Sequence, residues 1–251
     1  MTQHVPTRRL RFFLTAPTPC PYLDGREERK VFAHLPLHDG AYVNDQLTQA
    51  GFRRSQNIAY RPACEGCGAC VSARIPVLDY GFSRSERRVL ARNEDLVRTV
   101  VDAEATVEQF DLLRRYLNTR HAGGGMADMT WPDYVAMVED TAVRTQVVEY
   151  RRESVCGPGD LVACVLVDSL SDGLSLVYSF YDPALGRRSL GSFVILDHVV
   201  QAQLNEIPYV YLGYWVSGSD KMDYKAKFNP LEVLRPQGWT LLSARDRGAA
   251  V

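Results

Sequence analysis

The chain has 251 residues, of which 46% are hydrophobic and 24% charged, and its formal net charge is −1. These values are typical of a globular protein with one large or two small domains, and they exclude a helical membrane protein, because no stretch approaches the run of about 20 apolar residues that a membrane helix needs. The apolar part of the N-terminal segment is too short for a secretory signal and prolines follow it, so we expect a cytoplasmic protein with no membrane partner.

In the first half of the chain we expect short helices at residues 26–35 and 42–52, the second ended by Gly51, and a strand at 72–80. The segment CEGCGAC, residues 64–70, is expected to be a loop, because two glycines between three cysteines leave no regular period.

The loop cysteines Cys64, Cys67 and Cys70 are separated by two-residue gaps, and Cys20 provides a fourth thiol. Six cysteines in a cytoplasmic chain favour free thiols or a metal over a disulfide framework. Four thiolates suit structural zinc or an iron–sulfur cluster. The alternative is a group of reduced thiols that packs the loop or contacts a substrate. Cys164, in an apolar run, is expected to be a buried strand residue.

Arginines concentrate between residues 53 and 92, a segment that contains eight arginines and only three acidic residues. Ser83 and Glu86 form a capping-box pattern that predicts a helix over 83–96. Arg84, Arg88 and Arg92 recur every four residues and would share one face of this helix. Such a stripe can lie along a phosphate backbone, and the alternative is a salt-bridged surface helix.

The second half is predicted to begin with a helix at 107–121, a loop at 121–129 with Gly123 to Gly125 as a hinge, and a helix at 131–139 capped by Thr130. Three strands are expected to follow, at 145–150, 161–170 and 173–183. The chain then continues with a predicted helix at 187–206, a strand at 209–215 and a short helix or turn at 221–228. This order predicts an α+β fold, or an α/β fold, with a largely antiparallel sheet, and it is similar to the order in the GNAT acyltransferases. In those enzymes a helix N-terminus holds a pyrophosphate. Arg188 and Gly191 match that signature, but Phe193 departs from it and is expected to crowd the backbone.

Several longer blocks are more specific. They are YSFYDPALGRRSLGSF (178–193), YLGYWV followed by KM-YK--F-PLE (211–232), CPY (20–22), GFRRS (51–55), YRP-C--C-AC (60–70) and FSRSERR (82–88). In this order they resemble the arginyl-tRNA–protein transferases, from Cys20 to Trp239. The resemblance implies residues 1–97 as an N-terminal transferase domain with the cysteine cluster, and residues 98–251 as a C-terminal GNAT-like transferase domain.

Members of this family move an aminoacyl group from tRNA to the α-amine of a protein whose first residue is acidic, which marks that protein for degradation by an N-end rule pathway. The bacterial branch transfers leucine, so leucyl-tRNA and proteins that begin with Asp or Glu are the expected partners. Transfer itself requires no cofactor. Arginine as the transferred residue is the alternative. Less favoured are a coenzyme A-dependent N-acetyltransferase and a non-catalytic RNA-binding module.

This chemistry suggests a role for three groups of residues. The predicted catalytic residues are Tyr178, Tyr181, Asp182 and Arg188. The predicted tRNA-binding residues are Arg84, Arg87, Arg88, Arg92, Lys221, Tyr224 and Lys225. The predicted acceptor-binding residues are Arg53, Arg54, Arg61, Tyr214 and Trp215.

The tyrosines can donate to a developing oxyanion or stack on the terminal adenine, and Asp182 can hold an amine, although it can instead cap the next helix. The spacing of Lys221, Tyr224 and Lys225 places them on one helical face. The three acceptor-binding arginines can engage either tRNA phosphates or the acidic first residue.

Overall fold

The computed structural model describes residues 10–120, 126, 128–244 and 246–247. The predicted glycine hinge at Gly123 to Gly125 lies outside these residues. Among the helices that are described, none is both long and apolar enough to cross a bilayer.

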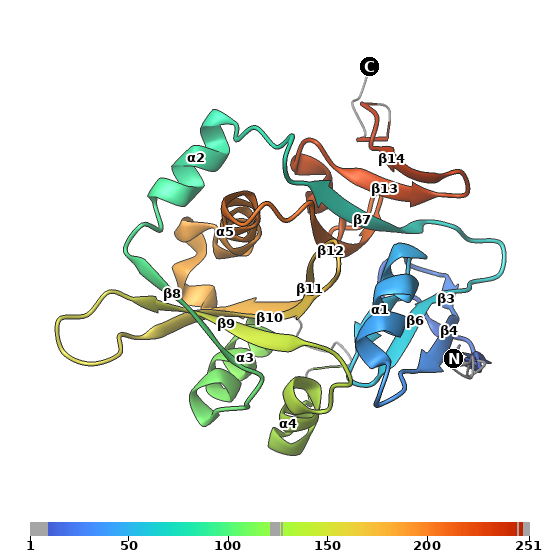
Figure 1. The fold of residues 1–251 in the computed structure, drawn as a ribbon, viewed down its shortest axis with the longest axis horizontal. Coiled ribbons are helices and arrows are strands. Elements are labelled where there is room, and N and C mark those ends of the chain that lie inside the picture. The colour runs from blue at the N-terminus through green and yellow to red at the C-terminus, as the bar shows by residue number, and fades with distance from the viewer. Residues whose placement is uncertain (1–9, 121–125, 127, 245, 248–251) are drawn as a thin grey trace, which may run out of the picture.

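An eight-stranded sheet forms the centre of the molecule (Figure 1), in the order β14-β13-β7-β12-β11-β10-β9-β8. In chain order its strands are β7 (Cys70–Pro76), β8 (Leu96–Asp102), β9 (Thr145–Arg152), β10 (Leu161–Ser169), β11 (Gly173–Tyr181), β12 (Tyr209–Val216), β13 (Glu232–Arg235) and β14 (Gly238–Leu241). All neighbours in this sheet are antiparallel except β11 and β12, which run parallel. The predicted α+β fold with a mainly antiparallel mixed sheet is thereby confirmed.

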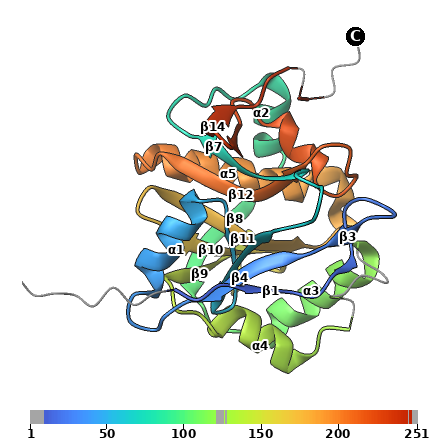
Figure 2. The same ribbon diagram turned by 90° about the vertical axis from the view of Figure 1, so that its right-hand side faces the viewer.

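Helices cover both faces of this sheet, as the two views show (Figures 1 and 2). They are α2 (Arg84–Ala91), α3 (Val107–Arg120), α4 (Trp131–Glu139) and α5 (Leu190–Leu204). One core lies between α5 and the sheet and a second between α3, α4 and the opposite face. β10 is buried along almost its whole length, including the predicted Cys164, because both of its faces are covered. α2 packs across α5, so α5 is covered on two sides.

A smaller sheet, β1-β4-β6-β5, precedes the large one. It contains β1 (Phe13–Leu14), β4 (Lys30–His34), β5 (Arg53–Ser55) and β6 (Ile58–Pro62), and it is accompanied by β2 (Thr18–Pro19), β3 (Glu27–Glu28) and α1 (Gly40–Gln49). The predicted helix at 26–35 is therefore wrong, because this segment forms β3 and β4. The expected domain boundary at residue 97 stays a prediction. β7, from the first segment, is a strand of the large sheet.

The start signals in the sequence are confirmed at two helices. Ser83 and Glu86 form the capping box of α2, and Thr130 and Asp133 form that of α4. The predicted helix at 187–206 is instead divided at Ser189, whose φ of 55° separates the 3₁₀ helix η1 (Pro183–Arg188) from α5. The segment after β12 contains a second 3₁₀ helix, η2 (Asp223–Lys227).

Candidate active site between strands β11 and β12

The parallel strands β11 and β12 separate soon after they begin. They pair only through Gly173–Ser175 and Tyr209–Tyr211. Further along, the register of β11 against β10 skips Val177, and the register of β12 against β7 skips Leu212. Such bulges bend a strand and increase its twist. Beyond the paired segment, Val177, Tyr178, Ser179 and Tyr181 of β11 are only half-buried although the strand lies inside the sheet.

The side chain of Arg53, from β5, lies where β11 and β12 separate. Its Nη2 atom donates a hydrogen bond to the carbonyl oxygen of Val177 at 2.9 Å, and its guanidinium lies 5.6 Å from the ring centre of Tyr214. Gly213 makes room for it, since a Cβ there would lie 2.3 Å from Arg53 Cζ, and its φ of 73° also favours glycine. No carboxylate of the described residues lies within ion-pairing distance of Arg53. The site therefore contains a half-buried cation with N–H groups free for an anion.

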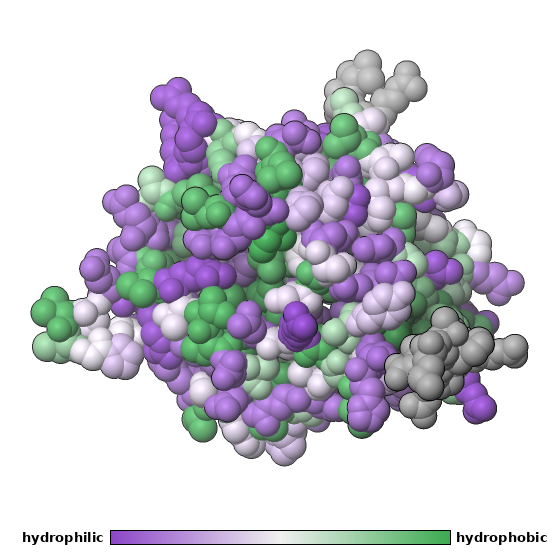
Figure 3. Space-filling model, viewed as in Figure 1, coloured by the Kyte–Doolittle hydropathy of each residue, from purple (hydrophilic) through white to green (hydrophobic). Residues whose placement is uncertain are grey.

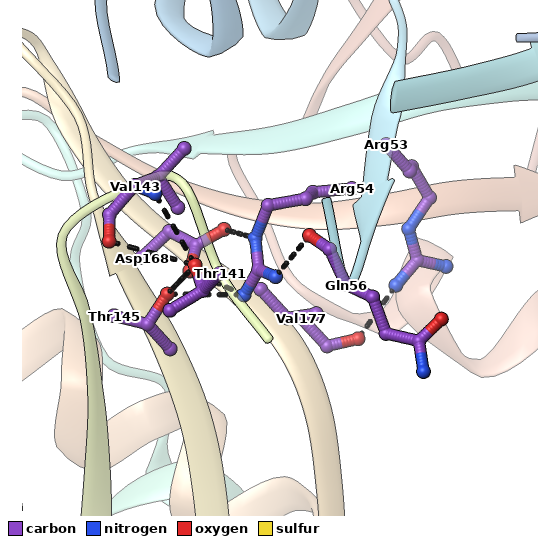
Figure 4. Close-up of polar contacts among 8 residues, drawn as sticks. All are labelled: Arg53, Arg54, Gln56, Thr141, Val143, Thr145, Asp168 and Val177. Carbon is purple, nitrogen blue, oxygen red and sulfur yellow. Dashed lines mark hydrogen bonds and ion pairs between the residues drawn. The ribbon is translucent and has the colours of Figure 1, made fainter. Parts of the chain in front are cut away.

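The neighbouring Arg54 turns the other way and is buried (Figure 4). Its Nε and Nη2 atoms donate to the two carboxylate oxygens of Asp168 at 2.5 and 2.7 Å. Asp168 also accepts a hydrogen bond from the hydroxyl of Thr145, and Arg54 Nη1 donates to the carbonyl of Gln56. This arrangement occupies the donors of Arg54, so the predicted acceptor-binding role conflicts with its position. The pair instead fixes β5, and with it Arg53, against β10.

Two more predicted ligands are buried. Lys225 of η2 is 4% exposed, and its Nζ donates to the carbonyl of Tyr214 at 2.5 Å. Trp215 is 4% exposed, and its indole N–H donates to Asp223. These positions conflict with the predicted tRNA-binding role of Lys225 and with the predicted acceptor-binding role of Trp215. Burial first, and the nearby Arg53 second, hold the pKa of Lys225 well below its usual value.

Tyrosines surround the guanidinium of Arg53. Tyr214 is buried and its hydroxyl donates to the carbonyls of Gly51 and Tyr60, so its predicted acceptor-binding role conflicts with its position. Tyr22 and Tyr224 lie close enough to affect the pKa of Arg53, and Tyr224 is 38% exposed. Burial raises the pKa of Tyr22 to about 12, although the positive charge of Arg53 acts in the opposite direction. These phenols are therefore neutral hydrogen-bond donors at pH 7.

The predicted catalytic tyrosines lie at the end of β11. The ring of Tyr181 packs edge-on against Tyr116 of α3 at 5.0 Å and lies against Gly191, in the first turn of α5. Tyr178 is half-buried, and burial raises its pKa to about 12. Both stay predictions as catalytic groups. Sequence reasoning missed Tyr116, since only the amphipathic pattern of its helix was visible and nothing in it marked one tyrosine.

Asp182 and Arg188 make structural contacts. Asp182 caps η1 by accepting a hydrogen bond from the Ala184 amide at 2.9 Å. Arg188 donates to the Asn93 side chain, to the Arg92 carbonyl and to Asp95. Arg188 thus ties η1 to the end of α2, and its predicted catalytic role conflicts with this placement.

The first turn of α5 differs from expectation in one further way. Phe193 is buried and packs edge-on against Tyr150 at 5.3 Å. It points into the core, so it does not crowd the helix N-terminus as expected.

The arginines of α2 remain available to a large ligand. Arg84, Arg87, Arg88 and Arg92 are exposed. Arg87 and Arg92 each donate one hydrogen bond to a backbone carbonyl, of Phe82 and Arg187. The face in Figure 3 shows hydrophobic residues only in small groups among hydrophilic ones. Arg61 is exposed and lies over the ring of Phe52, and Lys221 is exposed before η2.

Among the four predicted metal-binding cysteines, Cys20, Cys64 and Cys67 lie near Cys70, which begins β7. Burial, followed by the nearby Cys20, Cys64 and Cys67, raises the pKa of the Cys70 thiol to about 12. The donor set has the chemistry that zinc or an iron–sulfur cluster requires. In the described part of the chain, however, no three Cys, His, Asp or Glu side chains are arranged to share one metal ion. A metal site therefore stays a prediction.

If these thiols bind metal, purified protein is expected to contain zinc or iron, and Cys64→Ser and Cys67→Ser are each expected to lose it and to melt at lower temperature, because metal binding contributes to folding. Elemental analysis and thermal melting check this, with Cys156→Ser, an exposed cysteine elsewhere, as the matched control. A metal-free parent whose two variants fold and react normally would show that the cysteines are a reduced thiol cluster.

Comparisons with known proteins identify the family of this chain. Residues 18–88 match the model "Arginine-tRNA-protein transferase, N terminus", and residues 108–235 match the model for its C terminus. An aspartate/glutamate leucyltransferase of Phenylobacterium zucineum is 78% identical over 98% of this chain and 96% of its own length. One of Caulobacter vibrioides is 76% identical, over 99% and 90%. Among solved structures, FemX is similar at a TM-score of 0.47 and 8% identity, over 76% of this chain and 64% of FemX.

Proposed function

Because the chain belongs to the arginine-tRNA-protein transferase family, we propose that it transfers leucine from leucyl-tRNA to the α-amine of proteins that begin with Asp or Glu. Its near full-length relatives carry the leucyltransferase name, which supports leucine over arginine. We expect the reaction to take place in the cytoplasm and its product to be marked for degradation.

The observation that carries this proposal is the unpaired guanidinium of Arg53 between β11 and β12. An acceptor that begins with Asp or Glu brings a side-chain carboxylate, which a guanidinium can bind through two parallel N–H groups. We assign Arg53 to that carboxylate. Arg61 is exposed and remains a second candidate for the acceptor or for a tRNA phosphate.

The chemistry needs little beyond this positioning. The leucyl ester on the tRNA is already activated, and holding it beside an amine removes much of the entropic barrier. Negative charge develops on the ester carbonyl oxygen, so it needs hydrogen-bond donors. Tyr178 and Tyr181, at the end of β11, are phenols suited to that role or to stacking on the terminal adenine.

The body of the tRNA needs a basic surface. The exposed arginines of α2, together with Lys221 and Tyr224, are proposed to contact phosphates and ribose. The cysteine cluster, with or without a bound metal, is assigned a supporting role and no chemical step.

The test is transfer of labelled leucine and labelled arginine, from their charged tRNAs, to peptides that begin with Asp, Glu or Ala. We expect leucine on the Asp and Glu peptides alone. Arginine on those peptides would assign the chain to the arginyl type. No transfer from either tRNA would contradict the proposal, and saturable binding of acetyl-CoA would then favour an acetyltransferase.

A further inference from the structure

Lys225 is a buried amine without a counter-ion. Its Nζ atom has the Tyr214 carbonyl as its hydrogen-bond acceptor, and the sulfur of Met222 lies 3.9 Å away. No carboxylate of the described residues lies within ion-pairing distance of it. A buried ammonium without such a partner is costly, so the amine is favoured in its neutral form. A neutral amine that donates one N–H to a carbonyl keeps a free lone pair.

The groups that face Lys225 do not offset a positive charge. From β5 comes Arg53, itself a cation, whose field also disfavours an ammonium at Lys225. From β12 comes Tyr214, and from the same 3₁₀ helix comes Tyr224, whose ring centre lies 5.9 Å from Nζ. Burial raises the pKa of both phenols, so both are neutral at pH 7. Tyr22 and Tyr60, which also lie near Arg53, are phenols as well.

The position of this amine relates it to the acceptor. Nζ donates a hydrogen bond to the carbonyl of Tyr214, and the preceding residue, Gly213, lies so close to Arg53 that a Cβ there would be 2.3 Å from its guanidinium carbon. In Asp or Glu, only two or three carbon atoms separate the side-chain carboxylate from the α-nitrogen. An acceptor whose carboxylate lies on Arg53 can therefore place its α-ammonium near Lys225, for proton transfer directly or through one water.

We propose that Lys225 is the general base of the transfer, which accepts a proton from the α-ammonium of the acceptor; this rests on the function proposed above. The nitrogen lone pair released in this way attacks the ester carbonyl carbon of leucyl-tRNA. As the tetrahedral centre collapses, the carbon–oxygen bond to the ribose breaks, and a second proton from the nitrogen passes to the departing ribose oxygen. An amide and a free tRNA hydroxyl result, and Lys225 releases its proton to water.

The pH dependence of kcat/KM for an Asp peptide tests this. An unassisted amine reacts only as its free base, so the rate would fall about tenfold per pH unit below its pKa of about 8. With Lys225 as base, the wild-type rate is expected to stay level below pH 8, down to the lowered pKa of Lys225. Lys225→Met is expected to lose roughly 10²- to 10⁴-fold in kcat at neutral pH and much less at pH 9, where the acceptor amine is already deprotonated.

Two further variants separate catalysis from folding. Lys225→Gln keeps an N–H donor for the Tyr214 carbonyl but cannot accept a proton, so it is expected to show the same pH profile as Lys225→Met. Lys227→Met, at an exposed lysine of the same 3₁₀ helix, is expected to behave as wild type.

A wild-type rate that falls tenfold per pH unit below pH 8 would overturn the inference without any variant. A loss in Lys225→Gln that is equal at every pH would also overturn it, because that is the result of a structural role. Absence of wild-type transfer even at pH 9 would instead overturn the proposed leucine transfer itself, and the inference with it.

Discussion

Replacement of Asp168 with leucine is expected to lower the free energy of unfolding by about 3–5 kcal/mol, because the buried guanidinium of Arg54 would lose its carboxylate partner. Arg54 is 5% exposed and Asp168 is fully buried, so water cannot take over the lost contacts. Arg54→Met, which leaves the carboxylate without its cation, is expected to cost a similar amount. Urea denaturation of each variant, followed by circular dichroism, measures both effects.

The combined variant Arg54→Met with Asp168→Leu is the decisive comparison. An apolar pair of similar volume often replaces a buried ion pair at little cost, so the double variant is expected to recover most of the loss. Glu108→Ala removes an exposed carboxylate partner of Arg151 and leaves its second partner, Glu149, in place, so it is expected to cost less than about 1 kcal/mol. If Asp168→Leu costs no more than Glu108→Ala, the pair does not anchor β5 to the large sheet.

Local signals in the sequence predicted much of the fold. Capping boxes marked the starts of α2 and α4, and apolar runs marked β9 to β12. The segment REERKVFAHL was wrongly predicted to be a helix because many of its residues favour helices. It forms β4 instead, because β4 pairs with β6, with Ala33 opposite Ala59. That pairing joins residues far apart in the chain, and a single sequence contains no sign of it.

The site was predicted less well, for reasons of the same kind. Arg53 and Arg54 look alike in sequence, but β5 turns their side chains to different places, and Asp168 lies 114 residues from Arg54. Lys225 was expected to share an exposed face with Lys221 and Tyr224. Its segment is a 3₁₀ helix, with three residues per turn, so Lys225 leaves that face and turns toward β12.

Arg53→Met is expected to remove the preference for acidic acceptors, because the variant has no cation with free N–H donors to compensate the carboxylate for its lost hydration. Truncation of one partner of a buried charge pair typically costs about 2–5 kcal/mol. The kcat/KM for a peptide that begins with Asp should therefore fall roughly 30- to 4,000-fold. The kcat/KM for the matched Asn peptide, which brings no charge, should change much less. The ratio of the two rates, measured for each enzyme, reports selectivity independently of the amount of active protein.

Arg53→Lys keeps the charge but not the planar pair of donors, so it is expected to retain only part of the preference. Arg114→Met is the matched control, because Arg114 is an exposed arginine that also lies over an aromatic ring, at 6.0 Å from the centre of Phe110. If Arg53→Met lowers the rates for Asp and Asn peptides equally, Arg53 supports the fold between β11 and β12 and another group reads the acceptor. A selective loss for Asp would mean that Arg53, which lies where β11 and β12 separate, recognises the acidic first residue of the acceptor.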